Sequence, residues 1–288
     1  TVGFPPGGTT DVIARMMASY MATKLGRTVV VDNRPGASGN IAAGLVARAP
    51  ADGTTLLLSS STHATNASLY AKLPFDTVRD FAAAGMVAAT PYVMVVHPSV
   101  EARSVAEFIQ LLKARPGSLQ YATSSPGTGQ HLAAELFKRM AGVQMTQVPY
   151  KGSSAALPDL LAGRTPVMFE NLAIIQGHLK SGALRGLAIT STKRSPLAPE
   201  LPAVAESLPG FEVLGWFALI APSATPAPVL DELNGVVNAA LADESIQKKL
   251  RDLGAEPIGG TPAAADAFIR AEMERWGSVI RESKITLD

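Results

Sequence analysis

The sequence predicts an α/β protein of two lobes, each with a mainly parallel central sheet flanked by helices. Three observations support this prediction. The chain has 288 residues, 47% of them hydrophobic, which is more than a single hydrophobic core usually organises. Segments with helical periodicity alternate with short β-branched segments, as is typical of parallel sheets with right-handed crossovers. Two stretches of the chain also repeat one layout.

The repeated layout is a helix end, a short strand and a hydroxyl-rich loop. In the first copy, residues 47–53 (ARAPADG) precede an apolar run at 56–58 (LLL) and the hydroxyl groups of 59–62. In the second copy, residues 113–117 (KARPG) precede a strand and loop at 121–125. Pro and Gly are expected to end the helix in both copies. We therefore expect two lobes that follow the same βαβ plan.

The remaining elements follow in chain order. Periodic apolar residues predict a first helix at residues 11–25, and β-branched runs predict strands at 28–31 and 54–58. Late in the chain, several prolines precede helices predicted at about 229–241 and 263–283. We expect these last two helices to pack on the first lobe.

The lobe limits are predicted from two apolar segments that end in proline. We expect the chain to cross between lobes at residues 95–103 and 212–222. Lobe 1 then contains residues 1–98 and 221–288, and lobe 2 contains residues 99–220.

Composition excludes several classes of partner. The 25 basic and 24 acidic residues are mixed along the chain and give a net charge of +1, so there is no electrostatic footprint for nucleic acid or an anionic membrane. The absence of cysteine excludes disulfides and thiolate metal sites and suits an oxidising compartment. No apolar run reaches the roughly eighteen residues that a membrane span needs. We expect a small-molecule ligand.

The chain opens at Thr1 inside what reads as the end of a strand. We therefore expect a missing N-terminal piece, which could have included a signal peptide.

Two Gly-rich loops lead into predicted helices and are candidate anion sites. In residues 4–11 (FPPGGTTD), Gly7 and Gly8 can bring backbone N–H groups to a helix N-terminus. Residues 123–131 (TSSPGTGQH) add hydroxyl groups and are the stronger candidate. The alternative interpretation of the first loop is an ordinary Gly-rich turn before a capped helix. Neither loop has the glycine spacing of a dinucleotide fingerprint.

Two further loops place polar side chains after strands. Residues 148–154 (VPYKGSS) offer a Tyr hydroxyl, a Lys charge and backbone donors. Residues 167–171 (VMFEN) end an apolar strand with an acid, in the position of a crevice-facing side chain. Lys151 could instead be an ordinary surface lysine, and Glu170 could cap the next helix rather than receive a ligand amine or hydroxyl.

Known catalytic and metal-binding motifs are missing from the sequence. There is no Walker A sequence, G-x-S-x-G elbow or H-E-x-x-H. His131 and Glu135 are four residues apart, and pairing on a helix surface explains them more simply than a metal site. We expect no metal, no cofactor and no catalytic residue.

Together these segments resemble the substrate-binding receptors of tripartite tricarboxylate transporters, the TctC or Bug family of Gram-negative bacteria. The resemblance covers nearly the whole chain. It rests on seven segments in order: residues 4–8 with Asp11, 31–37 (VDNRPGA), 52–57 (DGTTLL), 73–76 (LPFD), 127–132 (GTGQHL), 148–152 (VPYKG) and 201–202 (LP). It implies the type II periplasmic-binding-protein fold, with a ligand cleft between two lobes that close over the ligand.

The resemblance also implies that one ligand carboxylate is held by backbone amides, hydroxyls and bridging waters from both lobes. Where the family usually has an Asp after the Met-Phe strand, this chain has Glu170. Lys151 would favour a second carboxylate on the ligand, whereas Glu170 would favour an amine. The predicted ligand-binding residues are Phe4, Pro6, Gly7, Gly8, Asp11, Ser60, Thr62, His63, Thr123, Ser124, Gly127, Thr128, Gly129, His131, Tyr150, Lys151, Gly152, Glu170 and Asn171.

We therefore predict a monomeric periplasmic receptor that captures a small carboxylate, with a dicarboxylate favoured, and delivers it to a membrane permease. One alternative is a ligand sensor of the same fold that signals to a membrane partner. The other is an α/β enzyme that uses His131, Lys151 and Glu170 as acid, base and electrophile.

Overall fold

The computed structural model describes residues 1–124, 127–282 and 285. The chain divides into two compact units. Unit 1 contains Thr1–Ala89 and Trp216–Arg281, and unit 2 contains Thr90–Gly215 and the residues from Glu282 onward. Each unit has its own strand pairing and hydrophobic core. The lobe limits and crossing segments given above remain predictions.

The sheet of unit 1 is built from β1 (Leu57–Ser60), β7 (Leu214–Pro222), the first part of β2 (Phe81–Val96) and β8 (Glu256–Gly259). The order is β1-β7-β2, and β8 also pairs with β2. β7 runs antiparallel to β1, and β8 runs antiparallel to β2. Val2 adds parallel bridges to Asn33 and Leu58.

The strand predicted at residues 28–31 is wrong. These residues have no regular secondary structure, and Val30 is 76% exposed. Their β-branched composition suggested a strand, and Val29 and Val31 do pack against the core, but strand propensity reflects this packing and does not supply a paired neighbouring strand. The next predicted strand begins late, at Leu57, because the Asp52 carboxylate accepts hydrogen bonds from the Thr54 N–H and hydroxyl and holds a turn there.

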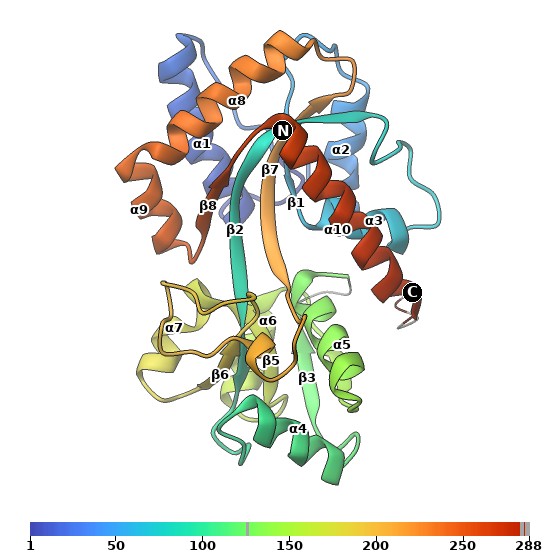
Figure 1. Ribbon diagram of the computed structural model, residues 1–288, viewed down its shortest axis with the longest axis vertical. Coiled ribbons are helices and arrows are strands. Elements are labelled where there is room, and N and C mark those ends of the chain that lie inside the picture. The colour runs from blue at the N-terminus through green and yellow to red at the C-terminus, as the bar shows by residue number, and fades with distance from the viewer. Residues whose placement is uncertain (125–126, 283–284, 286–288) are drawn as a thin grey trace. The chain divides into compact units, whose positions relative to one another are not determined.

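Helices cover both faces of the unit 1 sheet. Phe217 and Leu219 of β7 belong to the core formed with the first and eighth helices, whereas Trp216 packs against Phe268 of the tenth. Because alternate strand residues face opposite sides, β7 has a helical layer on each face. The helices (Figure 1) are α1 (Thr9–Leu25), α2 (Asn40–Ala47), α3 (Thr62–Leu69), α8 (Ala227–Ala242), α9 (Glu244–Asp252) and α10 (Pro262–Glu282), with a 3-10 turn at Ala37–Gly39.

The sheet of unit 2 is mainly parallel, as predicted. Its strands are the second part of β2, β3 (Gln120–Thr123), β4 (Thr146–Pro149), β5 (Val167–Asn171) and β6 (Arg185–Ile189). β3 is parallel to both β4 and β5. β5 and β6 both run antiparallel to β2 and are therefore parallel to each other. The ends of β3, β4 and β5 consequently share one edge of the sheet.

The helices of unit 2 begin where its strands end. In Figure 1, α5 lies alongside β3. α5 packs on β3 and β5, α6 packs on the same two strands, and α7 packs on β5. The helices are α4 (Val105–Ala114), α5 (Gly129–Ala141), α6 (Ser153–Leu161) and α7 (Leu172–Lys180), and a 3-10 turn follows at Val204–Glu206.

A buried carboxylate links α10 to β7 in unit 1. Glu272 Oε2 accepts hydrogen bonds from Trp216 Nε1 at 3.1 Å and from Trp276 Nε1 at 2.9 Å. Both tryptophans are at most 1% exposed. An indole N–H can only donate, so each ring depends on this acceptor.

We expect Glu272→Ala to lower the free energy of unfolding by about 2–4 kcal/mol, because it leaves two buried indole N–H groups without an acceptor. Urea unfolding followed by tryptophan fluorescence measures the change. Glu272→Gln keeps an acceptor oxygen and is the control, with an expected loss of about 1 kcal/mol. Equal losses in the two variants would contradict this account.

Candidate functional site

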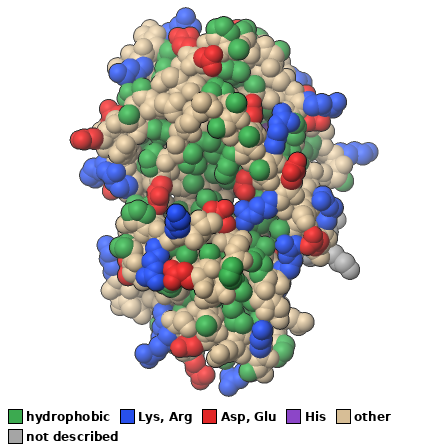
Figure 2. Space-filling model, viewed as in Figure 1, with side chains coloured by type: hydrophobic (Ala, Val, Ile, Leu, Met, Phe, Trp, Pro, Cys, Tyr) green, Lys and Arg blue, Asp and Glu red, His purple; other side chains and the backbone are tan. Residues whose placement is uncertain are grey.

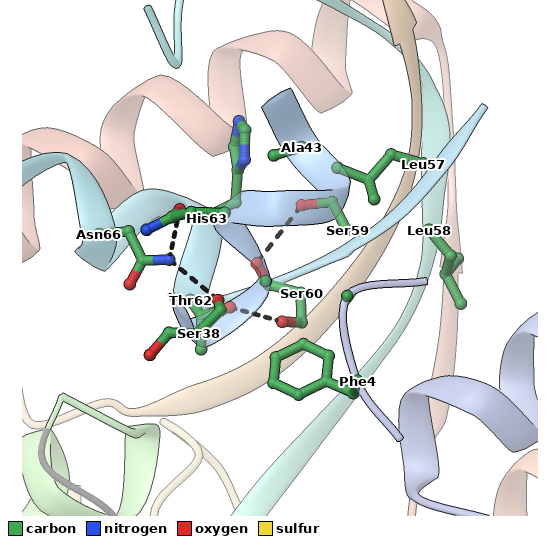
Figure 3. Close-up of a pocket in the computed structure, with 13 residues that line it drawn as sticks. Phe4, Ser38, Ala43, Leu57, Leu58, Ser59, Ser60, Thr62, His63 and Asn66 are labelled. Atoms are coloured by element: carbon green, nitrogen blue, oxygen red, sulfur yellow. Dashed lines mark hydrogen bonds between the residues drawn. The ribbon is translucent and has the colours of Figure 1, made fainter. Parts of the chain in front are cut away.

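A small cavity of about 20 Å³ lies in unit 1. It is formed by the start of the chain, the 3-10 turn before α2, β1 and the first turns of α3. Figure 3 shows Phe4 on one side of this cavity, with Ser60 and Thr62 opposite it. Its volume suits about one water molecule or one polar ligand group.

Asp11 holds the first Gly-rich loop in place. Its Oδ2 accepts hydrogen bonds from the Gly7 N–H and from Arg15 Nε, both at 2.9 Å. Its Oδ1 accepts from Asn33 Nδ2 at 2.9 Å, and Asn33 Nδ2 also donates to the Phe4 carbonyl at 3.0 Å. The hydrogen bonds from Arg15 and Gly7 lower the pKa of Asp11 to about 2. The Gly7 N–H, predicted to face an anion, is therefore already bonded to a protein carboxylate.

The polar side chains around the cavity form two hydrogen-bonded groups. Ser60 Oγ and Thr62 Oγ1 share a hydrogen bond of 2.9 Å (Figure 3). Asn66 Nδ2 donates to the Ser38 carbonyl at 3.0 Å and to Asn40 Oδ1 at 2.9 Å. Asn40 is 6% exposed, and within the described part of the chain its Nδ2 has no acceptor. The hydroxyl groups of Ser60 and Thr62 and the unused amide donor of Asn40 thus line the same small cavity in unit 1.

Ser38, Asn40 and Asn66 were missed in the sequence analysis. For Ser38 and Asn40, the available signal was the pair of glycines at 36, inside the 31–37 motif, and 39, just beyond it. The backbone between them is unusual, because Ser38 adopts a left-handed conformation with φ of 53°. Such conformations cost energy in residues with a side chain and are concentrated at functional sites.

His63 lines the cavity, but its ring packs against two aromatic rings. Its ring is 4.9 Å from the Phe81 ring and 6.3 Å from the Phe75 ring, measured between centroids. Its Nε2 is 3.3 Å from the Thr77 carbonyl oxygen. Burial lowers the pKa of His63 to about 4, so the ring is neutral at neutral pH. In Figure 3 the ring points away from Phe4 and Ser60. Ligand binding by His63 remains a prediction.

In unit 2, the loops after β3 and β4 are tied together. The Tyr150 N–H donates to the Thr123 carbonyl at 2.9 Å, and the Gly152 N–H donates to the Ser124 carbonyl at 2.7 Å. Residues 125 and 126 of the predicted loop lie outside the described residues. The structure thus brings Thr123, Ser124, Tyr150 and Gly152 together at one edge of the sheet.

His131 anchors the second Gly-rich loop. The Gly127 N–H donates to His131 Nδ1 at 3.0 Å, which places the ring proton on Nε2. That nitrogen lies 3.9 Å from Glu135 Oε1, which in turn accepts from Lys138 Nζ at 2.6 Å and from the Tyr121 hydroxyl. Burial lowers the pKa of His131. Among the described residues no group of His, Asp and Glu suits a metal ion.

Lys151 is exposed, whereas the side chain of its neighbour Tyr150 is hydrogen-bonded within unit 2. The Tyr150 hydroxyl donates to Asp159 Oδ2 at 2.7 Å and lies 3.3 Å from Thr165 Oγ1, so it is engaged within unit 2. Lys151 is exposed, and in the described ranges it forms no ion pair. Figure 2 shows that positive and negative side chains are otherwise mixed on the face in view. Lys151 is therefore available to an anionic ligand group.

Glu170 lies at the end of β5 and is fully buried. Its Oε1 accepts hydrogen bonds from the Asn171 N–H at 2.7 Å and from Gln130 Nε2 at 3.3 Å. Gln130 was not predicted as a site residue, although it lies inside the predicted loop. Burial raises the pKa of Glu170, and the donors around it oppose that shift.

Two α/β units with donor-rich loops after their strands define a solute-binding protein of the type II periplasmic-binding-protein fold. Residues 13–285 match the family model described as the tripartite tricarboxylate transporter family receptor, TctC. The chain belongs to this family, whose receptors are periplasmic, and the family prediction is confirmed. Within the described residues no helix is both long enough and apolar enough for a bilayer crossing.

Relatives support the assignment along the full length of the chain. Protein BugT of Bordetella pertussis (strain Tohama I) is 40% identical over 285 residues, which cover 98% of this chain and 87% of BugT. A Rhodopseudomonas palustris structure with adipate is 41% identical with a TM-score of 0.86, and covers 99% of this chain and 96% of that one. The structure of MatC from the same organism, with bound malate, is 29% identical with a TM-score of 0.81, and 97% of each chain is covered.

We expect Asp11→Ala to release the loop at residues 4–8. The Gly7 amide should exchange its hydrogen faster, and the free energy of unfolding should fall by about 1–3 kcal/mol, because three donors lose the buried carboxylate that accepts from them. Hydrogen exchange and urea unfolding measure these effects. Asp252→Ala, which removes an exposed ion pair with Lys248, is the control and should change stability by less than about 1 kcal/mol. Unchanged exchange at Gly7 would contradict the proposed anchor.

We expect His63 to make the protein less stable as the pH falls from 6.5 to 4. Between these two pH values the imidazole of His63 is protonated in the unfolded chain but stays neutral in the folded protein, because its pKa is lower there. The unfolded state therefore binds more protons and is favoured as the pH falls. The loss should reach about 3 kcal/mol at the low end. Glu170 and Asp266, whose pKa values are raised, act in the opposite direction.

His63→Phe isolates the histidine contribution, since it keeps an aromatic ring between Phe75 and Phe81. Urea unfolding at several pH values should give a flatter pH dependence in this variant. The same slope in both proteins would show that His63 does not resist protonation.

Proposed function

We propose that this receptor captures a small dicarboxylate, releases it chemically unchanged, and delivers it to the membrane components of a tripartite tricarboxylate transporter. Membership of the family over residues 13–285 carries the proposal. The similarity to structures with adipate and with malate supports a carboxylate ligand. We further propose that the protein acts as a monomer in the periplasm and is exported with a signal peptide that is later removed.

Unit 1 is proposed to bind one ligand carboxylate. Its candidate donors are the hydroxyls of Ser60 and Thr62, the amide of Asn40 and the backbone N–H groups at the start of α1. These donors are uncharged, and a carboxylate can accept several hydrogen bonds at once. Helix N-termini contribute about 0.3–2 kcal/mol each to binding an anion, a fraction of the roughly 8 kcal/mol that micromolar affinity requires. The remainder is assigned to hydrogen bonds and to apolar contact with Phe4.

Unit 2 is proposed to bind the other end of the ligand. Lys151 is an exposed cation on the loop before α6, and Thr128 lies at the start of α5. A second ligand carboxylate would pair with the Lys151 ammonium, which explains our preference for dicarboxylates. Asp11 and His131, which are also among the predicted residues, are proposed to hold these loops in shape.

The test is a thermal-shift screen followed by calorimetry on the purified protein. The panel contains adipate, succinate, malate and acetate, with glucose and ATP as non-carboxylate probes. A ligand at one hundred times its Kd should add about 2.7 kcal/mol to the stability of the folded state. We expect stabilisation by at least one dicarboxylate, and NMR should recover that ligand unchanged after long incubation.

Lys151→Gln tests the assignment of the second carboxylate. It should weaken a dicarboxylate by about tenfold and leave the monocarboxylate acetate unaffected, since the loss of one charged hydrogen bond is about 1.5–3 kcal/mol. Lys193→Gln, at another exposed lysine of unit 2, is the control. Stabilisation by glucose or ATP alone would overturn the proposed function.

A further inference from the structure

Glu170 lies where several helices of unit 2 begin. The parallel pairing of β3 with β4 and β5 brings the ends of these strands to one edge. Gln130 is the second residue of α5, Ser153 is the first residue of α6, and Asn171 precedes the first residue of α7. All of them face the Glu170 carboxyl group.

The donors from these helix starts favour the charged form of Glu170. The Asn171 N–H and Gln130 Nε2 donate to Oε1, and the Ser153 hydroxyl also favours the charged carboxyl. Helix N-termini carry partial positive charge, which stabilises an anion in their first turn. Burial raises the pKa of Glu170 and opposes this effect, as expected for a carboxyl group that is 0% exposed.

The second carboxylate oxygen of Glu170, unlike the first, lacks a hydrogen-bond donor in the described part of the chain. Oε2 is buried and has no hydrogen-bond partner among the residues that the structure describes. Nine-tenths or more of buried polar groups are satisfied in native proteins, so an unused acceptor at this edge needs an explanation. A charged carboxylate oxygen can only accept hydrogen bonds. Its missing partner must therefore be a donor.

We infer that Glu170 is a specificity-determining residue whose Oε2 accepts a hydrogen bond from a hydroxyl or ammonium group on the ligand. This inference rests on the proposed capture of a dicarboxylate. A ligand with such a donor next to a carboxylate satisfies the buried oxygen, whereas an unsubstituted diacid brings only acceptors. Lys151, on the loop before α6, remains available for the second carboxylate, so Glu170 selects among diacids and does not exclude them.

The experiment compares ligands that differ in one substituent. Succinate, malate and aspartate share a four-carbon diacid skeleton and carry hydrogen, hydroxyl or ammonium at one carbon; adipate and 2-aminoadipate form a six-carbon pair. Calorimetry gives the Kd of each ligand for the wild type, Glu170→Gln and Glu200→Gln. Glu200 is an exposed acid of unit 2 and is the matched control.

We expect the wild type to prefer the substituted member of at least one set. In Glu170→Gln this preference should fall by about tenfold, because the amide that replaces Oε2 can donate instead of accept. Glu200→Gln should keep it. Glu170→Asp retains the negative charge and should keep part of the preference for ammonium, which gives a second variant should the glutamine variant fail to fold.

Three results would overturn the inference. The first is a preference that survives in Glu170→Gln. The second is a wild type that prefers succinate and adipate, increasingly so at lower pH, since a protonated Glu170 would then donate to a ligand carboxylate. The third is a wild type that binds no carboxylate in the panel, which removes the proposed function as well. The first two results leave the proposed function intact, so the failures are distinguishable.

Discussion

Parallel strand pairing is the constraint on which the rest of unit 2 depends. A helix lies in the chain between β3 and β4, and another between β4 and β5, and such crossovers allow β3 to pair parallel with both β4 and β5. Parallel strands end at one edge, and each following helix starts there with unpaired backbone N–H groups. The edge is therefore rich in donors before any side chain is considered. The loops tied through Thr123, Ser124, Tyr150 and Gly152 are built on it.

A donor-rich edge also needs acceptors, and each unit supplies a carboxylate of its own. In unit 1, both oxygens of Asp11 are satisfied, and the hydrogen bonds from Arg15 and Gly7 keep its pKa low. In unit 2, Glu170 is bonded through one oxygen, and burial keeps its pKa high. The donors at each edge thus satisfy both carboxylate oxygens of Asp11, whereas at Glu170 they leave Oε2 without a hydrogen-bond partner among the described residues. Incomplete bonding is what makes Glu170 a candidate for selecting ligands.

Much of the fold could be predicted from the sequence because long amphipathic helices and Gly-rich turns are local signals. The helices predicted at residues 11–25, 229–241 and 263–283 correspond to α1, α8 and α10. The strand predicted at 28–31 failed because β-branched composition does not reveal whether a neighbouring strand exists. The orientation of His63 was equally hidden, since it depends on Phe75 and Phe81, which follow it by 12 and 18 positions in the sequence.

The sequence identified the candidate loops but not the hydrogen bonds made within them. A hydroxyl after a strand is visible in sequence, whereas the bond that already occupies a donor is not, as for Gly7 with Asp11 and Gly127 with His131. Asn40 and Asn66 were missed for the same reason, because they meet over 26 positions of sequence.

Neutral hydrogen-bond donors and charged side chains would contribute differently to ligand binding, which bears on how one receptor can accept several carboxylates and still prefer some of them. Neutral donors such as Ser60, Thr62 and Asn40 suit any carboxylate, because every carboxylate offers the same acceptors. Discrimination between ligands needs groups that attract one ligand and repel or leave unpaired another. In the roles proposed above, Lys151 favours a second negative charge on the ligand, and Glu170 favours a hydrogen-bond donor next to a carboxylate. A ligand that satisfies both is a dicarboxylate with a hydroxyl or ammonium substituent, a combination that neither residue would select alone.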